Sequence, residues 1–149
     1  FLFKIKINYP ELHDEIKILD RFKNKSWQTL VDSVETILQA EEIITLRSIV
    51  EEVYIKDELI TYIAKVVDQT RHDADLFLGA SPRASIALMR SAKALAALQG
   101  RPYVVPDDIK TMAFPVLNHR IQINPEREME GLESSEVINR ILESIEIPR

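Results

Sequence analysis

The sequence predicts a mainly helical protein with a single strand at its N-terminal end. From residue 10 onward, apolar side chains recur three, four and seven positions apart, which is the spacing of an amphipathic helix. Only residues 1–10 alternate between apolar and polar side chains, as a half-buried strand does. The length of 149 residues, with 46% hydrophobic and 29% charged residues, is typical of one compact globular domain.

The predicted strand places Phe1, Phe3, Ile5 and Ile7 on one side and ends at a proline. A lone strand can neither pair its backbone groups nor cover its apolar face. We therefore expect the strands that pair with it to lie outside this chain. The alternative is a terminal arm that packs on the helices.

Three amphipathic helices are predicted to follow. The first begins at a proline, which the first turn of a helix tolerates, and covers residues 10–22. Residues 23–35 are polar and irregular, so we expect a connector there. The other two helices keep acidic residues outside an apolar face and cover residues 41–53 and 57–71.

The next predicted helix, over residues 82–98, is the most apolar. Ser81 can cap it, Pro82 suits its first position, and Gly100 stands where a left-handed residue closes the last turn. Apolar residues, six of them alanines, occur nearly all round this segment. We therefore expect a central, buried helix.

Two arginines lie on one narrow stripe of that helix. Arg83 and Arg90 are separated by about 20° around the axis, at 100° per residue, and alanines make up the rest of the stripe. They could be ordinary surface arginines. Alternatively, Arg83 adds its charge to the unpaired amides of the first turn and attracts an anion such as a phosphate oxygen.

The last third of the chain predicts two more helices. One begins near Pro106, with acidic residues in its first turn, and is ended or kinked by Pro115. Residues 119–125 are expected to be extended. Ser134 or Ser135 then caps the last helix.

Composition excludes several kinds of site. The chain has no cysteine, so it cannot form a zinc ribbon, an iron–sulfur cluster, a thiol nucleophile or a disulfide framework. Its three histidines are remote from one another, and its only dense group of metal-ligating residue types, at positions 72–75, is interpreted as a solvated loop. We therefore expect no metal site. The glycines at 79, 100 and 131 are too far apart to form a phosphate-binding P-loop.

Charge and hydropathy limit the partners. The net charge of −5 provides no broad positive field, so we expect no nucleic acid partner. No stretch is long and apolar enough to span a membrane, and the first ten residues lack the pattern of a signal peptide. We expect no membrane partner and a cytoplasmic location. Because the chain begins with Phe1 inside an apolar segment, we also expect it to be a piece of a longer protein.

Three motifs, in this order, resemble the C-terminal part of MoxR-type AAA+ ATPases. They are Gly79-Ala80-Ser81-Pro82-Arg83-Ala84-Ser85, Tyr103-Val104-Val105-Pro106-Asp107-Asp108-Ile109-Lys110 and Pro115-Val116-Leu117-Asn118-His119-Arg120. The similarity covers the whole chain. It implies that residues 11–149 form the C-terminal helical lid bundle of such an ATPase. Residues 1–10 would be the last strand left over from the α/β core domain, which is otherwise absent.

The resemblance also implies a function. In this family the Gly-Ala-Ser-Pro-Arg segment carries the sensor 2 arginine, so Arg83 would be catalytic and would contact the γ-phosphate of ATP, with Ser81 and Pro82 beside it in the cofactor-binding segment. ATP and Mg²⁺ would bind mainly to the core domain of the full-length protein. Neither is expected on this piece, which should be inactive alone.

Members of the family are hexameric, chaperone-like ATPases that mature partner proteins. The implied partners are the protein's own core domain, neighbouring subunits and proteins with von Willebrand factor A domains. The competing interpretation is a self-contained helical protein-interaction module whose arginine stripe contacts a protein. Under the family resemblance, Arg90 would support the ATP site or contact a neighbouring subunit, although an ion pair with a surface carboxylate is the favoured interpretation.

Two residues depart from the family pattern. Val105 stands where the family usually has Thr, which removes a side-chain cap at a cost of about 1 kcal/mol. Gln39 replaces the usual Ser and weakens a second cap. Neither change touches Arg83.

Overall fold

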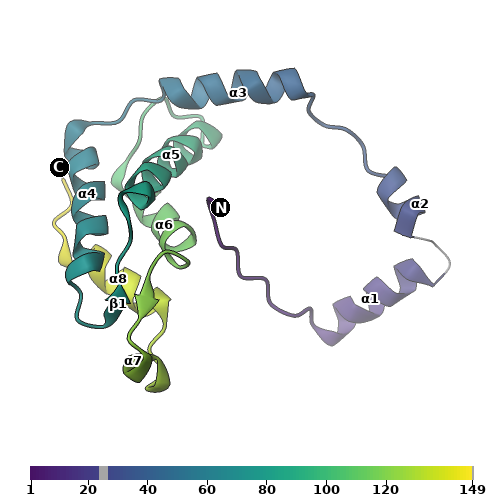
Figure 1. Cartoon of the computed structure of the whole chain (residues 1–149). Coiled ribbons are helices and arrows are strands. Elements are labelled where there is room, and N and C mark those ends of the chain that lie inside the picture. The colour runs from purple at the N-terminus through teal and green to yellow at the C-terminus, as the bar shows by residue number, and fades with distance from the viewer. Residues whose placement is uncertain (24–26, 149) are drawn as a thin grey trace. The chain divides into compact units, whose positions relative to one another are not determined.

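The computed structural model describes residues 1–23 and 27–148, and these are mostly helical (Figure 1). The chain divides into two compact units. One consists of Phe1–Ile5 and Leu46–Arg149, and the other of Lys6–Thr45. The predicted fold class, mainly α, is confirmed. Within the described residues no helix is both long enough and apolar enough to cross a membrane.

The larger unit is a bundle of four main helices, which lie together in Figure 1. Contacts between α5 and α6 are the most extensive, and α4 and α8 complete the bundle. The bounds of these helices are α4, Asp57–His72; α5, Pro82–Leu98; α6, Pro106–Leu117; and α8, Ser134–Ser144.

The core of the bundle combines branched side chains with alanines. Ala84, Ala92 and Ala96 of α5 are completely buried, because small side chains let neighbouring helices approach closely. The branched side chains around them come from the other three helices, and the most deeply buried are Val66, Val67, Ile109, Val116, Val137 and Ile138.

Helix α5 is buried on one side only. The prediction of a helix surrounded by other elements is therefore wrong in part, since Ile86 is 50% exposed and Leu98 is 85% exposed. The prediction for its end is confirmed, because Gly100 has a φ of 71° in the left-handed region.

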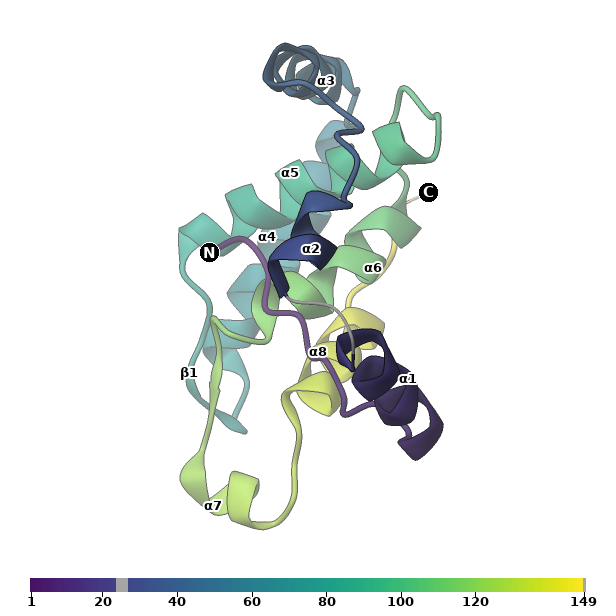
Figure 2. The same cartoon turned by 90° about the vertical axis from the view of Figure 1, so that its right-hand side faces the viewer.

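A small sheet lies beside the bundle. Strands β1 (Leu76–Leu78) and β2 (Gln122–Ile123) pair antiparallel, with Leu76 opposite Ile123. Strand β2 lies in the segment predicted to be extended. Strand β1 and the short helix α7 (Pro125–Met129), which follows β2 in the chain and is labelled in Figure 2, were not predicted. Three to five residues are too few for a period of two or of 3.6 to be recognised.

Two predicted helix ends differ in the structure. Helix α6 continues through Pro115 to Leu117, because burial of Val116 and Leu117 holds the last turn although the proline lacks an N–H. Helix α8 begins at Ser134, with Glu133 in the cap position and without a side-chain cap. Neither serine therefore caps it.

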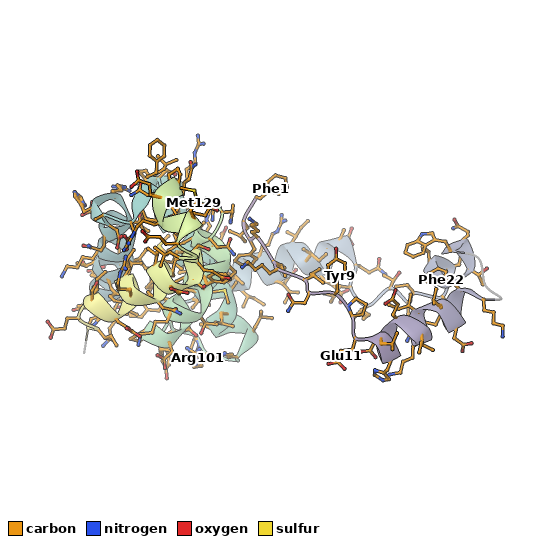
Figure 3. The ribbon with its side chains drawn as sticks, turned by 90° about the horizontal axis from the view of Figure 1, so that it is seen from below. Phe1, Tyr9, Glu11, Phe22, Arg101 and Met129 are labelled. Carbon is orange, nitrogen blue, oxygen red and sulfur yellow. The ribbon has the colours of Figure 1, made fainter. Side chains whose placement is uncertain are left out.

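The smaller unit contains α1 (Leu12–Phe22) and α2 (Trp27–Asp32). Helix α1 confirms the prediction, whereas α2 occupies the expected connector. The rings of Phe22 and Trp27 are stacked with centroids 5.8 Å apart, and Figure 3 labels Phe22. Helix α3 (Ala40–Glu52) was predicted correctly, but none of its residues is buried.

Residues 1–10 form no strand among the described residues. The strands expected to pair with them would lie outside this chain, so the interpretation as the last strand of a core domain stays a prediction. A strand requires a ladder of backbone hydrogen bonds, and none of the described residues provides one for this segment. Phe1–Ile5 belong instead to the larger unit and bond to the end of α6, as the terminal-arm alternative expects. Phe1, Ile5 and Ile7 are exposed.

An ion pair fixes the start of α6. The side chain of Asp108 is only 3% exposed and accepts hydrogen bonds from both Arg101 Nη atoms, at 2.6 and 3.0 Å. It also accepts one from the Val105 N–H at 2.8 Å. A capping box has two reciprocal bonds between the cap residue and the residue three positions later. Asp108 accepts the N–H of Val105 and so makes one of them, whereas the valine side chain has no oxygen to make the other.

We expect Asp108→Ala to lower the free energy of unfolding by about 2 kcal/mol, because the part-buried Val105 N–H and Arg101 lose their acceptor. Urea denaturation followed by circular dichroism measures the change. Asp107→Ala is the matched control, since this neighbouring carboxylate is 88% exposed and its nearest cation, Lys110, is 3.9 Å away. Equal losses in the two variants would contradict the account.

Candidate functional site

The loop that leads into α5 is anchored to the end of α4. The backbone N–H of Ala80 donates to Thr70 Oγ1 at 2.9 Å, and Arg71 Nε donates to the Ala80 carbonyl at 2.9 Å. Thr70 Oγ1 donates in turn to the Val67 carbonyl at 2.6 Å. Ala80 and Thr70 are each about 1% exposed. Both polar backbone groups of Ala80 are thus bonded, and the start of α5 has a fixed position.

Gly79 allows this loop to approach α4 closely. A Cβ atom at this position would lie 2.5 Å from the Thr70 carbonyl oxygen and 2.6 Å from the Arg71 Cα. These distances are shorter than any ordinary carbon contact, and both neighbours are backbone atoms. Only a residue without a side chain therefore fits here.

Ser81 and Pro82 occupy the positions that the sequence predicts. Ser81 is the cap residue of α5, with φ −78° and ψ 165°, and its carbonyl accepts the Ala84 N–H at 2.8 Å. Its hydroxyl makes no capping hydrogen bond, so this part of the prediction is wrong. Pro82 follows in the first turn, and both residues are exposed.

Arg83 lies in the first turn of α5 with its side chain exposed. No hydrogen bond or ion pair to another described residue engages its guanidinium. The same holds for Arg90, which is also exposed, so the expected surface ion pair of Arg90 is not found within residues 1–23 and 27–148. Ala87 between them is buried. The stripe therefore presents two arginines that are available to other groups.

A groove opens beside the start of α5. It joins one face of α4 to the first turn of α5 and is lined by Thr61, Ala64, Lys65, Asp68, Arg71, Pro82 and Ser85. Lys65 and Arg71 contribute positive charge, and Asp68 lies 3.6 Å from Arg71. Sequence reasoning missed these α4 residues. Their spacing of three or four positions places them on one helical face, but that pattern alone does not distinguish a binding surface from any other polar face.

The two carboxylates of the loop after α4 are held by arginines. Arg140 donates to Asp73 at 2.9 Å and to Asp75 at 2.7 Å, and Arg127 donates to Asp75 at 2.7 Å. This loop, interpreted as solvated, therefore joins α7 and α8 to the end of α4. Within the described parts of the chain, no group of three or more His, Asp or Glu side chains could hold a metal ion.

Hydrogen bonds from Arg127 and Arg140 lower the pKa of Asp75 below its ordinary value of 3.8. The folded protein therefore keeps this carboxylate charged at a pH where the unfolded chain begins to protonate it. Its contribution to stability is complete above about pH 5 and is lost as the pH falls past the ordinary value and through the lowered pKa.

We expect Asp75→Asn to be less stable than the parent at pH 7 and to lose less of its remaining stability between pH 5 and pH 2, because it lacks the titrating group. Urea denaturation at several pH values measures both effects. Glu126→Gln, at an exposed position of α7, is the control. Parallel pH profiles for Asp75→Asn and the parent would contradict this role for Asp75.

Comparisons with known proteins agree with this architecture. Residues 68–141 match the family described as AAA lid domain. The chain is 36% identical over 148 residues to the uncharacterized protein YeaC of Bacillus subtilis, and the match covers 99% of this chain and 45% of YeaC. It is 30% identical over 158 residues to the chaperone MoxR1 of Mycobacterium tuberculosis, covering 100% of this chain and 41% of MoxR1.

A solved structure gives the same result. A crystal structure of a candidate ATPase from Cytophaga hutchinsonii matches 100% of this chain with a TM-score of 0.86 and 34% identity. The match covers 47% of that protein. The chain thus spans less than half the length of each of these three relatives.

Proposed function

Because this chain belongs to the AAA lid domain family and is similar along its whole length to MoxR-type AAA+ ATPases, we propose that it is the lid of an ATP-hydrolysing protein, in which Arg83 senses the γ-phosphate of ATP. The complete protein would carry a nucleotide-binding core domain in addition to this lid. Residues 1–10 would lead from that core into the lid.

The observation that carries this proposal is the state of Arg83. Its helix begins at an anchored loop, yet its guanidinium is exposed and bonds to none of the residues described. A cation that the described residues leave unpaired is suited to a ligand that arrives from outside, and the fork of an arginine matches the geometry of phosphate.

The surroundings of Arg83 fit an anionic ligand. The positive end of the α5 dipole and the side chain of Lys65 lie at this corner of the bundle, where Arg71 is paired with Asp68. The Ser81 hydroxyl makes no capping bond and is a further donor, while Pro82 fixes the direction in which the helix starts. Both residues would thus assist Arg83 in binding nucleotide.

ATP bound with Mg²⁺ on the core domain would supply the phosphoryl group that is transferred. Arg83 would place its positive charge beside the oxygens on which negative charge increases in the transition state. Because the guanidinium belongs to the lid, binding ATP and losing its γ-phosphate would favour different lid positions. The similarity to a protein named a chaperone supports the use of this cycle to remodel partner proteins.

The experiment that tests the proposed function compares steady-state ATP turnover by the complete protein and by residues 1–149 alone. We expect turnover by the complete protein and none above background by the isolated chain, which contains no P-loop motif. A heat-inactivated sample and a P-loop variant of the complete protein are the controls. Turnover by a pure preparation of the isolated chain would contradict the proposal, as would an inactive complete protein.

A further inference from the structure

The C-terminal end of α6 binds the backbone of the N-terminal segment, Phe1–Ile5. A helix leaves its last four carbonyls without partners inside the helix, and each needs a donor from elsewhere. Here all four find one. The bonds are Asn118 N to Phe114 O at 3.0 Å, Lys4 N to Pro115 O at 3.1 Å, Arg120 Nη1 to Val116 O at 2.5 Å and Arg120 N to Leu117 O at 2.8 Å.

Side chains that follow α6 bind the same segment from the other direction. Asn118 Nδ2 donates to the Lys4 carbonyl at 3.1 Å. The guanidinium of Arg120 donates to the carbonyls of Leu2 and Phe1, at 3.1 and 2.6 Å. With the Lys4 N–H bond, four hydrogen bonds hold this segment, and every one of them involves its backbone. Figure 3 labels Phe1 at the start of the segment.

Part of this contact is shielded from water. Asn118 is only 9% exposed, and the Nε2 atom of His119 between the two donors is buried. Burial lowers the pKa of Arg120 and that of His119. The Asn118 bond is part-buried, whereas the two Arg120 bonds to the segment are exposed and gain their strength from the charge of the donor.

The same helix links this contact to Arg83. Helix α6 makes its most extensive contacts with α5, and Arg83 lies in the first turn of α5. The N-terminal segment, α6 and α5 all belong to the larger unit. Packed helices move as rigid bodies, so a change in the position of Arg83 is transmitted to residues 1–5.

We propose that Asn118 and Arg120 are positioning residues that fasten the backbone of Phe1–Ile5 to the helices that carry Arg83. They determine where Arg83 lies relative to any domain that precedes this segment. The contact itself stands on the hydrogen bonds above, whereas its effect on ATP turnover rests on the proposed function.

Amide hydrogen exchange in the complete protein tests the contact directly. We expect the Lys4 amide to be protected in the parent and to exchange at least about tenfold faster in Asn118→Leu, which keeps the side-chain size but removes the donor, and in Arg120→Ala. Amides of α5 should keep their protection, and Arg47→Ala, an exposed arginine without a bond to the described residues, should change nothing. An unprotected Lys4 amide in the parent would overturn the proposal.

ATP turnover by the same variants tests the positioning role. We expect Arg120→Ala and Asn118→Leu to lower kcat about fivefold or more while KM for ATP changes less than twofold. The reason is that neither residue is proposed to bind nucleotide. Arg120→Lys should recover part of kcat, since an ammonium still donates to carbonyls but lacks the fork. Parent-like kcat in both variants would overturn the role, and the proposed function would stand if Arg83→Ala still lost activity. If Arg83→Ala were also fully active, both the positioning role and the proposed function would be overturned.

Discussion

Gly79→Ala is expected to lower the free energy of unfolding by about 3 kcal/mol, which is the upper part of the range for overpacked sites. The added Cβ would meet the Thr70 carbonyl oxygen at 2.5 Å and the Arg71 Cα at 2.6 Å. Because these are backbone atoms of α4, no side-chain rotation relieves the clash. The loop must move away from α4, and the two hydrogen bonds of Ala80 are then lost.

Urea denaturation of Gly79→Ala and of Gly100→Ala distinguishes the cost of a steric clash with α4 from the cost of a strained backbone conformation. Gly100 has a φ of 71° and nothing within 4 Å of an added Cβ, so its substitution should cost only about 1 kcal/mol. Equal stability of Gly79→Ala and the parent would mean that the loop does not lie against α4 as described. The start of α5, which carries Arg83, would then have no fixed position.

Arg83→Ala is expected to lower kcat for ATP hydrolysis by the complete protein about tenfold or more, equivalent to about 1.4 kcal/mol of transition-state stabilisation. The physical reason is the loss of a positive charge next to the phosphoryl group in transfer. Nucleotide binding should be largely retained if the core domain supplies most of the contacts. Protein stability should not change, because Arg83 bonds to none of the described residues.

Arg90→Ala is the matched control for this experiment. It removes the same side chain from the same exposed stripe, about 10 Å further along the helix axis at 1.5 Å per residue. Two arginines that far apart cannot reach the same phosphate group equally, so we expect less than a twofold change in kcat. A loss of activity in Arg90→Ala as large as that in Arg83→Ala would contradict this role. It would show that ATP hydrolysis depends on the overall positive charge of the stripe and not on a specific contact of Arg83.

The sequence was sufficient to predict the bundle. Helices α4, α5, α6 and α8 each repeat apolar residues over at least three turns, and burial of that face determines the structure. The position of Arg83 was also predictable, because Pro82 and Gly100 mark both ends of α5. The side-chain environment of Arg83 was not, since it depends on which elements pack nearby.

The N-terminal segment shows what a local sequence pattern leaves open. Alternation in residues 1–10 is typical of a strand, but a strand exists only where another strand pairs with it. In the structure the donors and acceptors come from α6 and from Asn118 and Arg120, more than 100 residues away in sequence. A local pattern contains no information about partners at that distance.

The groove beside α5 was missed for a related reason. Its residues on α4 form a polar stripe that is unremarkable in sequence, as every amphipathic helix has one. It becomes a candidate binding surface only because the Gly79–Ala80 loop brings the start of α5 against this stripe. The resemblance to MoxR-type ATPases identified the loop residues but not their α4 neighbours.

A crystal structure of the complete protein with Mg²⁺ and a non-hydrolysable ATP analogue would test directly whether Arg83 contacts the γ-phosphate. We expect the guanidinium of Arg83 to lie within hydrogen-bond distance, about 3 Å, of an oxygen of the γ-phosphate. Lys4 should remain bonded to the end of α6 in the same structure. An Arg83 side chain that points to solvent or binds another protein surface, with the nucleotide site fully occupied, would contradict the account.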